Sequence, residues 1–125
     1  MFYSVFAIIS GASLGALLRW ALSTALNPGF KPFSVGVLSA NLIGAYLIGL
    51  LLFYISNISS LNENYKLFLM TGFLGSLTTF SAFSLEIFMT LQSGKFFLAF
   101  GIMIAHVFGS LLMTFSGYIT GFYFK

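Results

Sequence analysis

The chain has 125 residues, of which 59% are hydrophobic and 6% are charged, and its mean hydropathy is +1.05. Soluble domains are typically about 25% charged, so this composition indicates a protein that lies in a lipid bilayer. The net charge of +3 comes from five cations and two carboxylates, which are too sparse for a nucleic-acid-binding patch. The absence of cysteine excludes disulfides and thiolate metal sites.

Four apolar segments predict four transmembrane helices, because one spanning helix needs roughly 20 mostly apolar residues. We expect these spans at residues 2–26, 33–56, 66–91 and 96–124. A proline and glycine turn at 27–32, a polar loop at 57–64 and a tight connector at 92–95 separate them. The predicted fold class is an all-α membrane protein that forms a single integral membrane domain over residues 1–125.

The charges near the span ends barely select an orientation in the membrane. Lys66 and Lys125 are expected on the side of the N-terminus, and Arg19, Lys31 and Lys95 on the opposite side. Cytoplasmic loops normally carry the excess of lysine and arginine, so this near balance predicts that both orientations are populated. Such a population permits an antiparallel homodimer with its two-fold axis in the membrane plane.

Small residues recur every four positions on three of the spans. This spacing favours close helix packing, because lipid supplies no hydrophobic drive between helices. A spacing of four drifts by roughly 40° per step around a helix, so the longest series is expected to serve two contacts. The three series are Gly11 and Gly15; Gly36, Ala40 and Gly44; and Gly101, Ala105, Gly109, Gly117 and Gly121.

The third span contains glycines and hydroxyl residues over positions 72–83, a composition that makes a poor continuous helix. We therefore expect a break near the middle of this span, where freed carbonyl and amide groups must be satisfied inside protein. A broken helix at this depth is typical of an ion site, and carbonyl oxygens from two antiparallel copies suit a hard cation such as Na⁺. A simple packing kink is the alternative interpretation.

Two aromatic residues and one amide are candidates for the wall of an anion pathway. Phe80 and Phe83 share a helix face, and their positive ring edges can face a small anion without trapping it. The alternative is ordinary packing, as for most of the 17 phenylalanines. Asn41 lies in the apolar second span, where its amide needs a partner. It can donate to an anion or form an interhelical hydrogen bond.

The fourth span carries a strip of hydrogen-bonding side chains at a spacing of four, formed by His106, Ser110, Thr114 and Tyr118. Such a strip can pass a dehydrated anion along the helix. The alternatives are hydrogen bonds to neighbouring helices, or hydroxyls that bond back to carbonyls of their own helix.

Two charged residues in the spans are candidates for the rim of such a pathway. Arg19 lies near the end of the first span, where it can snorkel to the interface or line a vestibule that attracts anions. Glu86 is an intramembrane carboxylate and is therefore a functional candidate; pairing with Arg19 or a place at a wet rim are the alternatives. No nucleophile with a base, metal-ligand cluster or phosphate loop is evident, so we expect that the chain is not an enzyme.

At these residues the sequence resembles the Fluc (also called CrcB) fluoride channel family, over essentially the whole chain. The resemblance rests on residues 11–20, 41–44 and 72–83. The run Thr79-Phe80-Ser81-x-Phe83 looks like the hallmark of the family. Two positions depart from the family pattern: Ala82 stands where many members carry threonine, and Ser76 where many carry glycine.

The resemblance implies a fluoride-selective channel in the bacterial inner (plasma) membrane that passively exports fluoride and lowers its toxicity. It also implies a dual-topology antiparallel homodimer with two separate pores, which agrees with the charge count. The implied pore residues are Asn41, Phe80, Ser81, Phe83, His106, Ser110 and Thr114. The family further implies that the backbone carbonyls of Gly75 and Thr78 bind a structural Na⁺ at the dimer interface, and that Arg19 and Glu86 lie near vestibules.

Two other functions remain open at this stage. A small dual-topology, proton-coupled exporter of cationic compounds has the same size, but it needs a membrane-embedded carboxylate, for which only Glu86 is available. A scaffold subunit without transport is the second alternative, although it leaves the mid-membrane break without a purpose.

Overall fold

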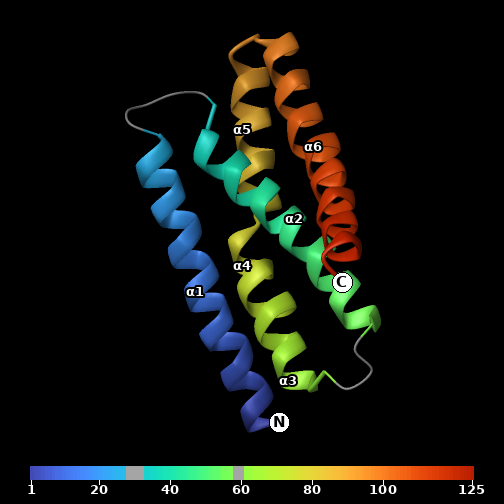
Figure 1. Cartoon of the computed structure of the whole chain (residues 1–125). Helices are drawn as coiled ribbons and strands as arrows, with labels where there is room; N and C mark the ends of the chain where they lie inside the picture. Colours follow the sequence, from blue (N-terminus) through green and yellow to red (C-terminus); the bar gives the residue numbers. More distant parts are fainter. Residues whose placement is uncertain (28–32, 58–60) are drawn as a thin grey trace.

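The computed structural model describes residues 1–27, 33–57 and 61–125. Most of the predicted turn at 27–32 and part of the predicted loop at 57–64 lie outside these residues. Figure 1 shows the order of the helical elements along the chain. They are α1 (Phe2–Leu26), α2 (Val35–Asn57), α3 (Glu63–Lys66), η1 (Leu67–Leu74), α4 (Gly75–Leu77), α5 (Phe80–Gln92) and α6 (Phe96–Tyr123).

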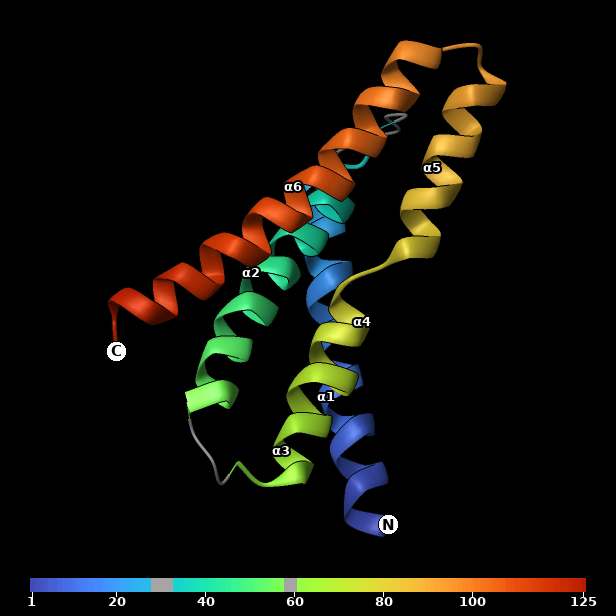
Figure 2. The same ribbon diagram turned by 90° about the vertical axis from the view of Figure 1, so that its right-hand side faces the viewer.

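Four segments are long and apolar enough to cross a membrane, as the composition predicts. They are α1, α2, the segment from α3 to α5 over Glu63–Gln92, and α6. Successive segments run in opposite directions, so the connection between α5 and α6 lies at the end of the molecule opposite the N-terminus (Figure 2). The chain therefore has the architecture of a multi-pass membrane protein.

The third segment is broken near its middle, as expected. It begins with α3 and η1, a π-helix, and continues through the single turn α4. Thr78 (φ −83°, ψ 153°) and Thr79 (φ −148°, ψ 118°) are then extended, and α5 starts at Phe80. Figure 2 shows α5 set aside from α4 by this extended link. The π-helix was not predicted, because its apolar residues are equally compatible with an α-helix.

The tight connector between α5 and α6 depends on a glycine in the left-handed region. Gly94 has φ +74° and its amide donates to the Leu91 carbonyl at 2.9 Å. The Ser93 amide donates to the Met89 carbonyl at 3.1 Å. A glycine at this place closes a helix end without the steric cost that a Cβ brings.

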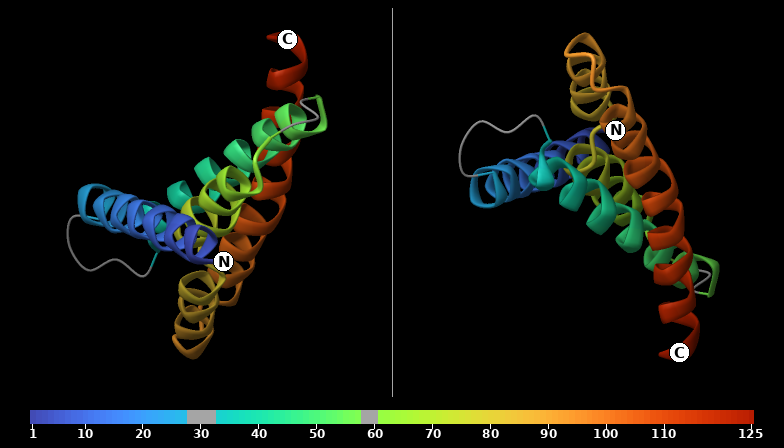
Figure 3. Two further views of the ribbon diagram at one scale, coloured as in Figure 1. Left: turned by 90° about the horizontal axis from the view of Figure 1, so that it is seen from below. Right: turned by 90° about the horizontal axis from the view of Figure 1, so that it is seen from above.

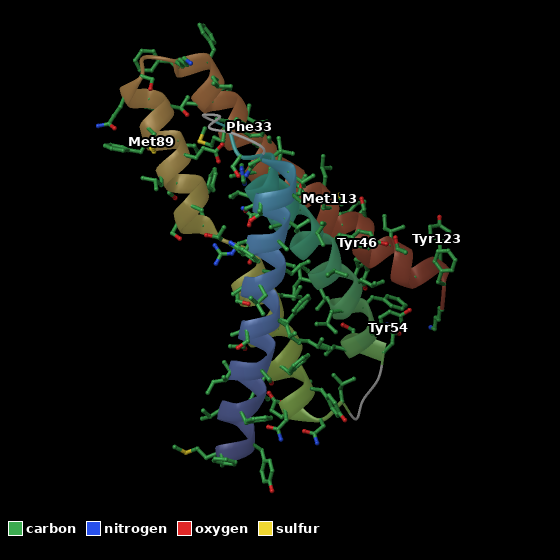
Figure 4. All side chains as sticks on the ribbon, turned by 90° about the vertical axis from the view of Figure 1, so that its left-hand side faces the viewer. Phe33, Tyr46, Tyr54, Met89, Met113 and Tyr123 are labelled. Atoms are coloured by element: carbon green, nitrogen blue, oxygen red, sulfur yellow. The ribbon has the colours of Figure 1, made fainter. Side chains whose placement is uncertain are left out.

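Glycines bring three pairs of helices into close contact, one of them α1 with α2, where a Cβ on Gly36 would meet the backbone of Ser23. In the pair formed by α1 and η1, a Cβ on Gly11 or Gly15 would meet the carbonyl oxygens of Phe68 or Phe73. In the pair formed by α2 and α6, a Cβ on Gly49 would meet the carbonyl of Thr114. Tyr46 and Met113 are labelled at the crossing of α2 and α6 in Figure 4. These contacts are of the kind that small residues permit in membranes.

Three glycines of the small-residue series on α6 face α2. A Cβ on Gly117 or Gly121 would meet Tyr46 or Phe53 of α2, and one on Gly109 would lie 3.1 Å from a Leu42 side-chain carbon, also of α2. A Cβ on Gly101 would have nothing within 4 Å among the described residues. Among the described residues these glycines therefore have one neighbour, α2.

The helices spread apart in three directions, so the chain has little interior of its own. Seen along its long axis, α1, α5 and the C-terminal end of α6 point away from one another (Figure 3). A small cluster of Ala40, Leu74 and Leu77 is buried beside the break. Apolar side chains elsewhere cover the outside, and Met89 on α5 stands clear of the other helices (Figure 4).

Candidate functional site

A groove of about 480 Å³ runs along the broken segment and is walled by α2, α6 and the residues around the break. Of the predicted pore residues it brings together all except Ser81, and it also includes both residues whose carbonyls were expected to hold Na⁺. The ones in its wall are Asn41, Gly75, Thr78, Phe80, Phe83, His106, Ser110 and Thr114. Residues from three separate spans thus meet in one place.

Phe80 and Phe83 form an edge-to-face pair at the start of α5. Their ring centroids are 5.2 Å apart with an interplanar angle of 78°. The Phe83 ring is 6% exposed and also packs on the His106 ring, with centroids 4.6 Å apart. Phe80, in contrast, is 77% exposed. The Phe83 ring is therefore buried in the groove, whereas the Phe80 ring is free to contact a molecule that binds at the groove.

Asn41 is bound to the broken segment through both ends of its amide. Its Oδ1 accepts from the Thr79 amide at 2.7 Å, and its Nδ2 donates to the Thr79 carbonyl at 3.1 Å. The same Nδ2 lies 3.0 Å from Nδ1 of His106. Both polar groups of an extended residue are thus satisfied by one side chain, which has the same effect as a neighbouring β-strand. The interhelical bonding considered for Asn41 is present.

The break releases the two carbonyls that were expected to hold a cation. In a continuous helix Gly75 would accept from the Thr79 amide and Thr78 from the Ala82 amide. The Thr79 amide instead donates to Asn41, and the Ala82 amide donates to the Thr79 hydroxyl at 3.2 Å. Both carbonyls lose their usual helical donors. Backbone oxygens of this kind are suitable ligands for a hard cation.

The hydroxyls of α6 divide between the groove and their own helix. Thr114 donates from Oγ1 to the Ser110 carbonyl at 3.0 Å, the back-bonding that was considered as an alternative. Tyr118 does not line the groove and instead packs edge-on against Phe53, with centroids 5.7 Å apart. Ser81, which is also absent from the groove wall, lies with its Oγ 3.2 Å from that of Thr79.

Arg19 and Glu86 both bind backbone atoms, and neither lines the groove. Arg19 donates from Nε to the Ser76 carbonyl at 3.1 Å, just before the break. Glu86 is 8% exposed, and its Oε1 accepts from the Ser34 amide at 2.6 Å, at the start of α2. The ion pair with Arg19 that was considered for Glu86 is not formed among the described residues. The Ser34 amide is its partner instead.

Comparison with known proteins identifies the family. Residues 6–118 match the model of the family described as "CrcB-like protein, Camphor Resistance (CrcB)". The chain belongs to this family. The match spans all four membrane-crossing segments and the groove between them, so the resemblance seen in the sequence is confirmed.

Curated relatives of this chain share nearly half of its residues. A protein of Marinobacter nauticus is 48% identical over 120 residues, which cover 96% of this chain and 95% of that protein. A protein of Acinetobacter baumannii is 46% identical over 120 residues, covering 96% and 94%. One from Burkholderia lata is 47% identical over 114 residues, covering 91% and 89%. Each is named "Fluoride-specific ion channel FluC".

The names of these relatives agree with the expectation that the chain is not an enzyme. All are named as ion channels.

Sequence reasoning assigned no role to Thr79, which lines the groove, or to Ser34, which binds Glu86 outside it. Thr79 caps α5, because its side chain accepts from the Ala82 amide. Ser34 precedes α2, and its Oγ accepts from the Val37 amide at 3.1 Å. Hydroxyl residues just before a helix are typical N-caps. That preference was the available signal, and it would have placed the start of both helices.

Proposed function

We propose that the chain is a fluoride-selective ion channel that exports fluoride passively from the bacterial cytoplasm across the inner membrane and so lowers its toxicity. The observation that carries the proposal is the single groove that gathers Asn41, Phe80, Phe83, His106 and Ser110 from three spans. The choice of fluoride as the ion rests on the names of the relatives, which are fluoride-specific ion channels.

Selectivity in this proposal comes from a mixture of weak and strong hydrogen-bonding groups. The ring edges of Phe80 and Phe83 carry partial positive charge and face an anion without holding it firmly. The polar side chains of His106 and Ser110, which lie in the same groove wall, replace water around the ion. In this proposal a small anion fits between the phenylalanine rings and the hydrogen-bond donors, whereas the larger chloride ion meets the rings before it reaches the donors.

The driving force is the membrane potential, and no coupled ion is needed. Fluoride enters acid-exposed cells as neutral HF, which dissociates inside and leaves the anion trapped by its charge. An inside-negative potential favours outward movement of an anion by about 2.3 kcal/mol per 100 mV. A passive pore is therefore sufficient for export.

We propose that the working unit is an antiparallel homodimer with two pores. The 77% exposure of the Phe80 ring supports this assembly, since a second copy laid against the groove would cover the ring. The charge distribution supports dual topology, because Lys66 and Lys125 lie toward one side and Arg19 and Lys95 toward the other. A two-fold axis in the membrane plane closes such a pair.

We further propose that Na⁺ is bound where the two copies meet, by the carbonyls of Gly75 and Thr78. These are the two carbonyls from which the break takes the usual helical donors, Thr79 N–H and Ala82 N–H. The hydrocarbon of the membrane contains no hydrogen-bond donors for such carbonyl oxygens, and a hard monovalent cation would bind them instead. Bound there, the ion would hold the two broken segments together.

The exporter alternative finds no support in the position of Glu86. This carboxylate binds the Ser34 amide and lies outside the groove, whereas an exporter needs it in the chamber that receives the substrate. The channel therefore remains the function that the geometry supports best.

The test is ion release from liposomes that contain the purified protein. Fluoride-loaded and chloride-loaded liposomes are compared with ion-selective electrodes after a potassium ionophore is added. The variant Phe83→Leu removes a ring from the groove, and Phe108→Leu is the matched control, because Phe108 is a 60% exposed residue of α6 outside the groove wall.

The expected result is rapid fluoride release without chloride release, with roughly two- to tenfold slower release for Phe83→Leu, since aromatic contacts contribute about 0.5–1.5 kcal/mol. Phe108→Leu should resemble the wild type. Equal release of the two anions, or no release of either by the wild type, would refute the channel proposal.

A further inference from the structure

The amide of Asn41 has no hydrogen-bond donor left to offer an ion. Its orientation is fixed by Thr79, because the Thr79 N–H must face Oδ1 and the Thr79 carbonyl must face Nδ2. A primary amide has two N–H bonds. One is directed to the Thr79 carbonyl at 3.1 Å, and the other to Nδ1 of His106 at 3.0 Å.

This arrangement determines the protonation pattern of the His106 ring. Because Nδ1 receives an N–H from Asn41, it must present its lone pair, and the proton of the neutral imidazole then lies on Nε2. The ring is 4% exposed and packs against the Phe83 ring at an interplanar angle of 30°. Nε2 is buried and makes no hydrogen bond to any residue of the described chain.

We infer that Asn41 is a positioning residue, whose amide holds the break at Thr79 and fixes the tautomer of His106, so that the Nε2–H of His106 is left as a donor for the anion. Asn41 then acts on the ion through its neighbours. The inference has one part that concerns the chain alone, the ring tautomer, and one that rests on the proposed function, the use of Nε2–H by fluoride.

The position of Asn41 allows one amide both to bind Thr79 and to orient His106. It lies on α2 and bonds to the extended link before α5 and to the ring on α6, so it joins the three walls of the groove. The pair Phe80 and Phe83 begins directly after the residue that Asn41 holds. Loss of the amide would release the link and the ring together.

The first experiment measures the tautomer directly. The chain contains one histidine, so protein labelled with ¹⁵N in the histidine ring and reconstituted in lipid vesicles gives one pair of ring-nitrogen resonances. At neutral pH we expect Nε2 to be protonated and Nδ1 not. A wild-type ring with the proton on Nδ1 would overturn the inference.

Two variants separate the role of Asn41 from the general environment. Asn41→Asp keeps an acceptor for the Thr79 amide but turns the donor toward His106 into an acceptor, so the proton is expected to move to Nδ1. Ser110→Ala, which alters the same groove, should leave the ring pattern unchanged. An Asn41→Asp ring that keeps an unprotonated Nδ1 would refute the positioning role. If Asn41→Asp does not fold, the wild-type spectrum alone decides.

The part that concerns fluoride has its own readout. Adding fluoride should shift the Nε2 resonance of the wild type, whereas the same concentration of chloride should not. In flux measurements His106→Gln, which retains one acceptor and one donor, should keep more release than His106→Leu, with a difference of roughly tenfold. An unmoved Nε2 resonance, or equal flux in the two variants, would remove His106 as the donor. A wild type that releases no fluoride would refute the proposed function and leave the tautomer result standing.

Discussion

The contact between α2 and α6 depends on Gly117, and we predict that one added methyl group there forces the two helices apart. A Cβ on Gly117 would meet the Tyr46 carbonyl oxygen, and would lie 2.9 Å from the Tyr46 carbonyl carbon and 3.0 Å from the Leu50 nitrogen. All three are backbone atoms of α2, so they cannot turn aside as a side-chain end can. Gly117→Ala therefore requires a shift of a whole helix.

The size of the effect follows from two opposing contributions. Overpacking costs about 1–3 kcal/mol, and a clash with backbone belongs at the upper end. Alanine in place of glycine returns roughly 1 kcal/mol of helix propensity. The net loss for Gly117→Ala is then about 2 kcal/mol, or roughly 30-fold in the unfolding equilibrium. Gly101→Ala has the same propensity gain, and among the described residues nothing lies within 4 Å of its Cβ, so it is the matched control.

The measurement is unfolding in mixed micelles with an increasing fraction of sodium dodecyl sulfate, followed by near-ultraviolet circular dichroism of the aromatic side chains. Gly117→Ala should unfold at a lower detergent fraction than the wild type, and Gly101→Ala at an equal or higher one. The difference between the two variants isolates the overpacking cost. If both variants unfold at the same fraction, the close approach of α2 and α6 is not what stabilises this pair.

Three further predictions use the same unfolding measurement. Glu86→Gln keeps an acceptor for the Ser34 amide and should match the wild type, whereas Glu86→Leu leaves that amide without one and should cost about 1–3 kcal/mol; equal stability of the two would contradict the capping role. Arg19→Met removes the donor to the Ser76 carbonyl and should cost about 1.5–3 kcal/mol, with Arg19→Lys in between; an unchanged Arg19→Met protein would show that the bond contributes nothing. Exchange of Na⁺ for N-methylglucamine should lower the unfolding midpoint, with recovery when Na⁺ returns, and a midpoint indifferent to Na⁺ would count against the Thr78 carbonyl as a ligand.

The four spans could be predicted from the sequence because they depend on composition over many residues. A stretch of roughly 20 apolar residues has few structures open to it in lipid. Their packing partners were not predictable in the same way. The α6 glycines suggested two neighbours by their spacing, but among the described residues they meet α2, and a Cβ on Gly101 would have nothing within 4 Å. The spacing determines which face of a helix carries the small residues, but the crossing angle between helices determines which neighbour packs against that face.

The break was predicted as a region but not as a residue. Glycines and hydroxyls occur throughout positions 72–83, and local propensity alone does not choose among them. The choice of Thr79 is made by Asn41, 38 positions away, which satisfies both polar groups of the extended residue. A helix in lipid breaks where its freed backbone groups find partners. Those partners come from the tertiary fold.

The same reasoning explains why the partners of the polar side chains in the spans were the least predictable part of the site. A polar side chain in a span needs a partner, and the sequence suggests other side chains or the ion for that role. In this fold a broken segment supplies backbone groups that compete for the same side chains. Asn41 binds Thr79, Arg19 binds the Ser76 carbonyl, and Glu86 binds the amide that precedes α2. These three polar side chains of the spans thus bind backbone groups of the fold. The Nε2–H of His106, which is not used in this way, is then the group to test first for contact with the ion.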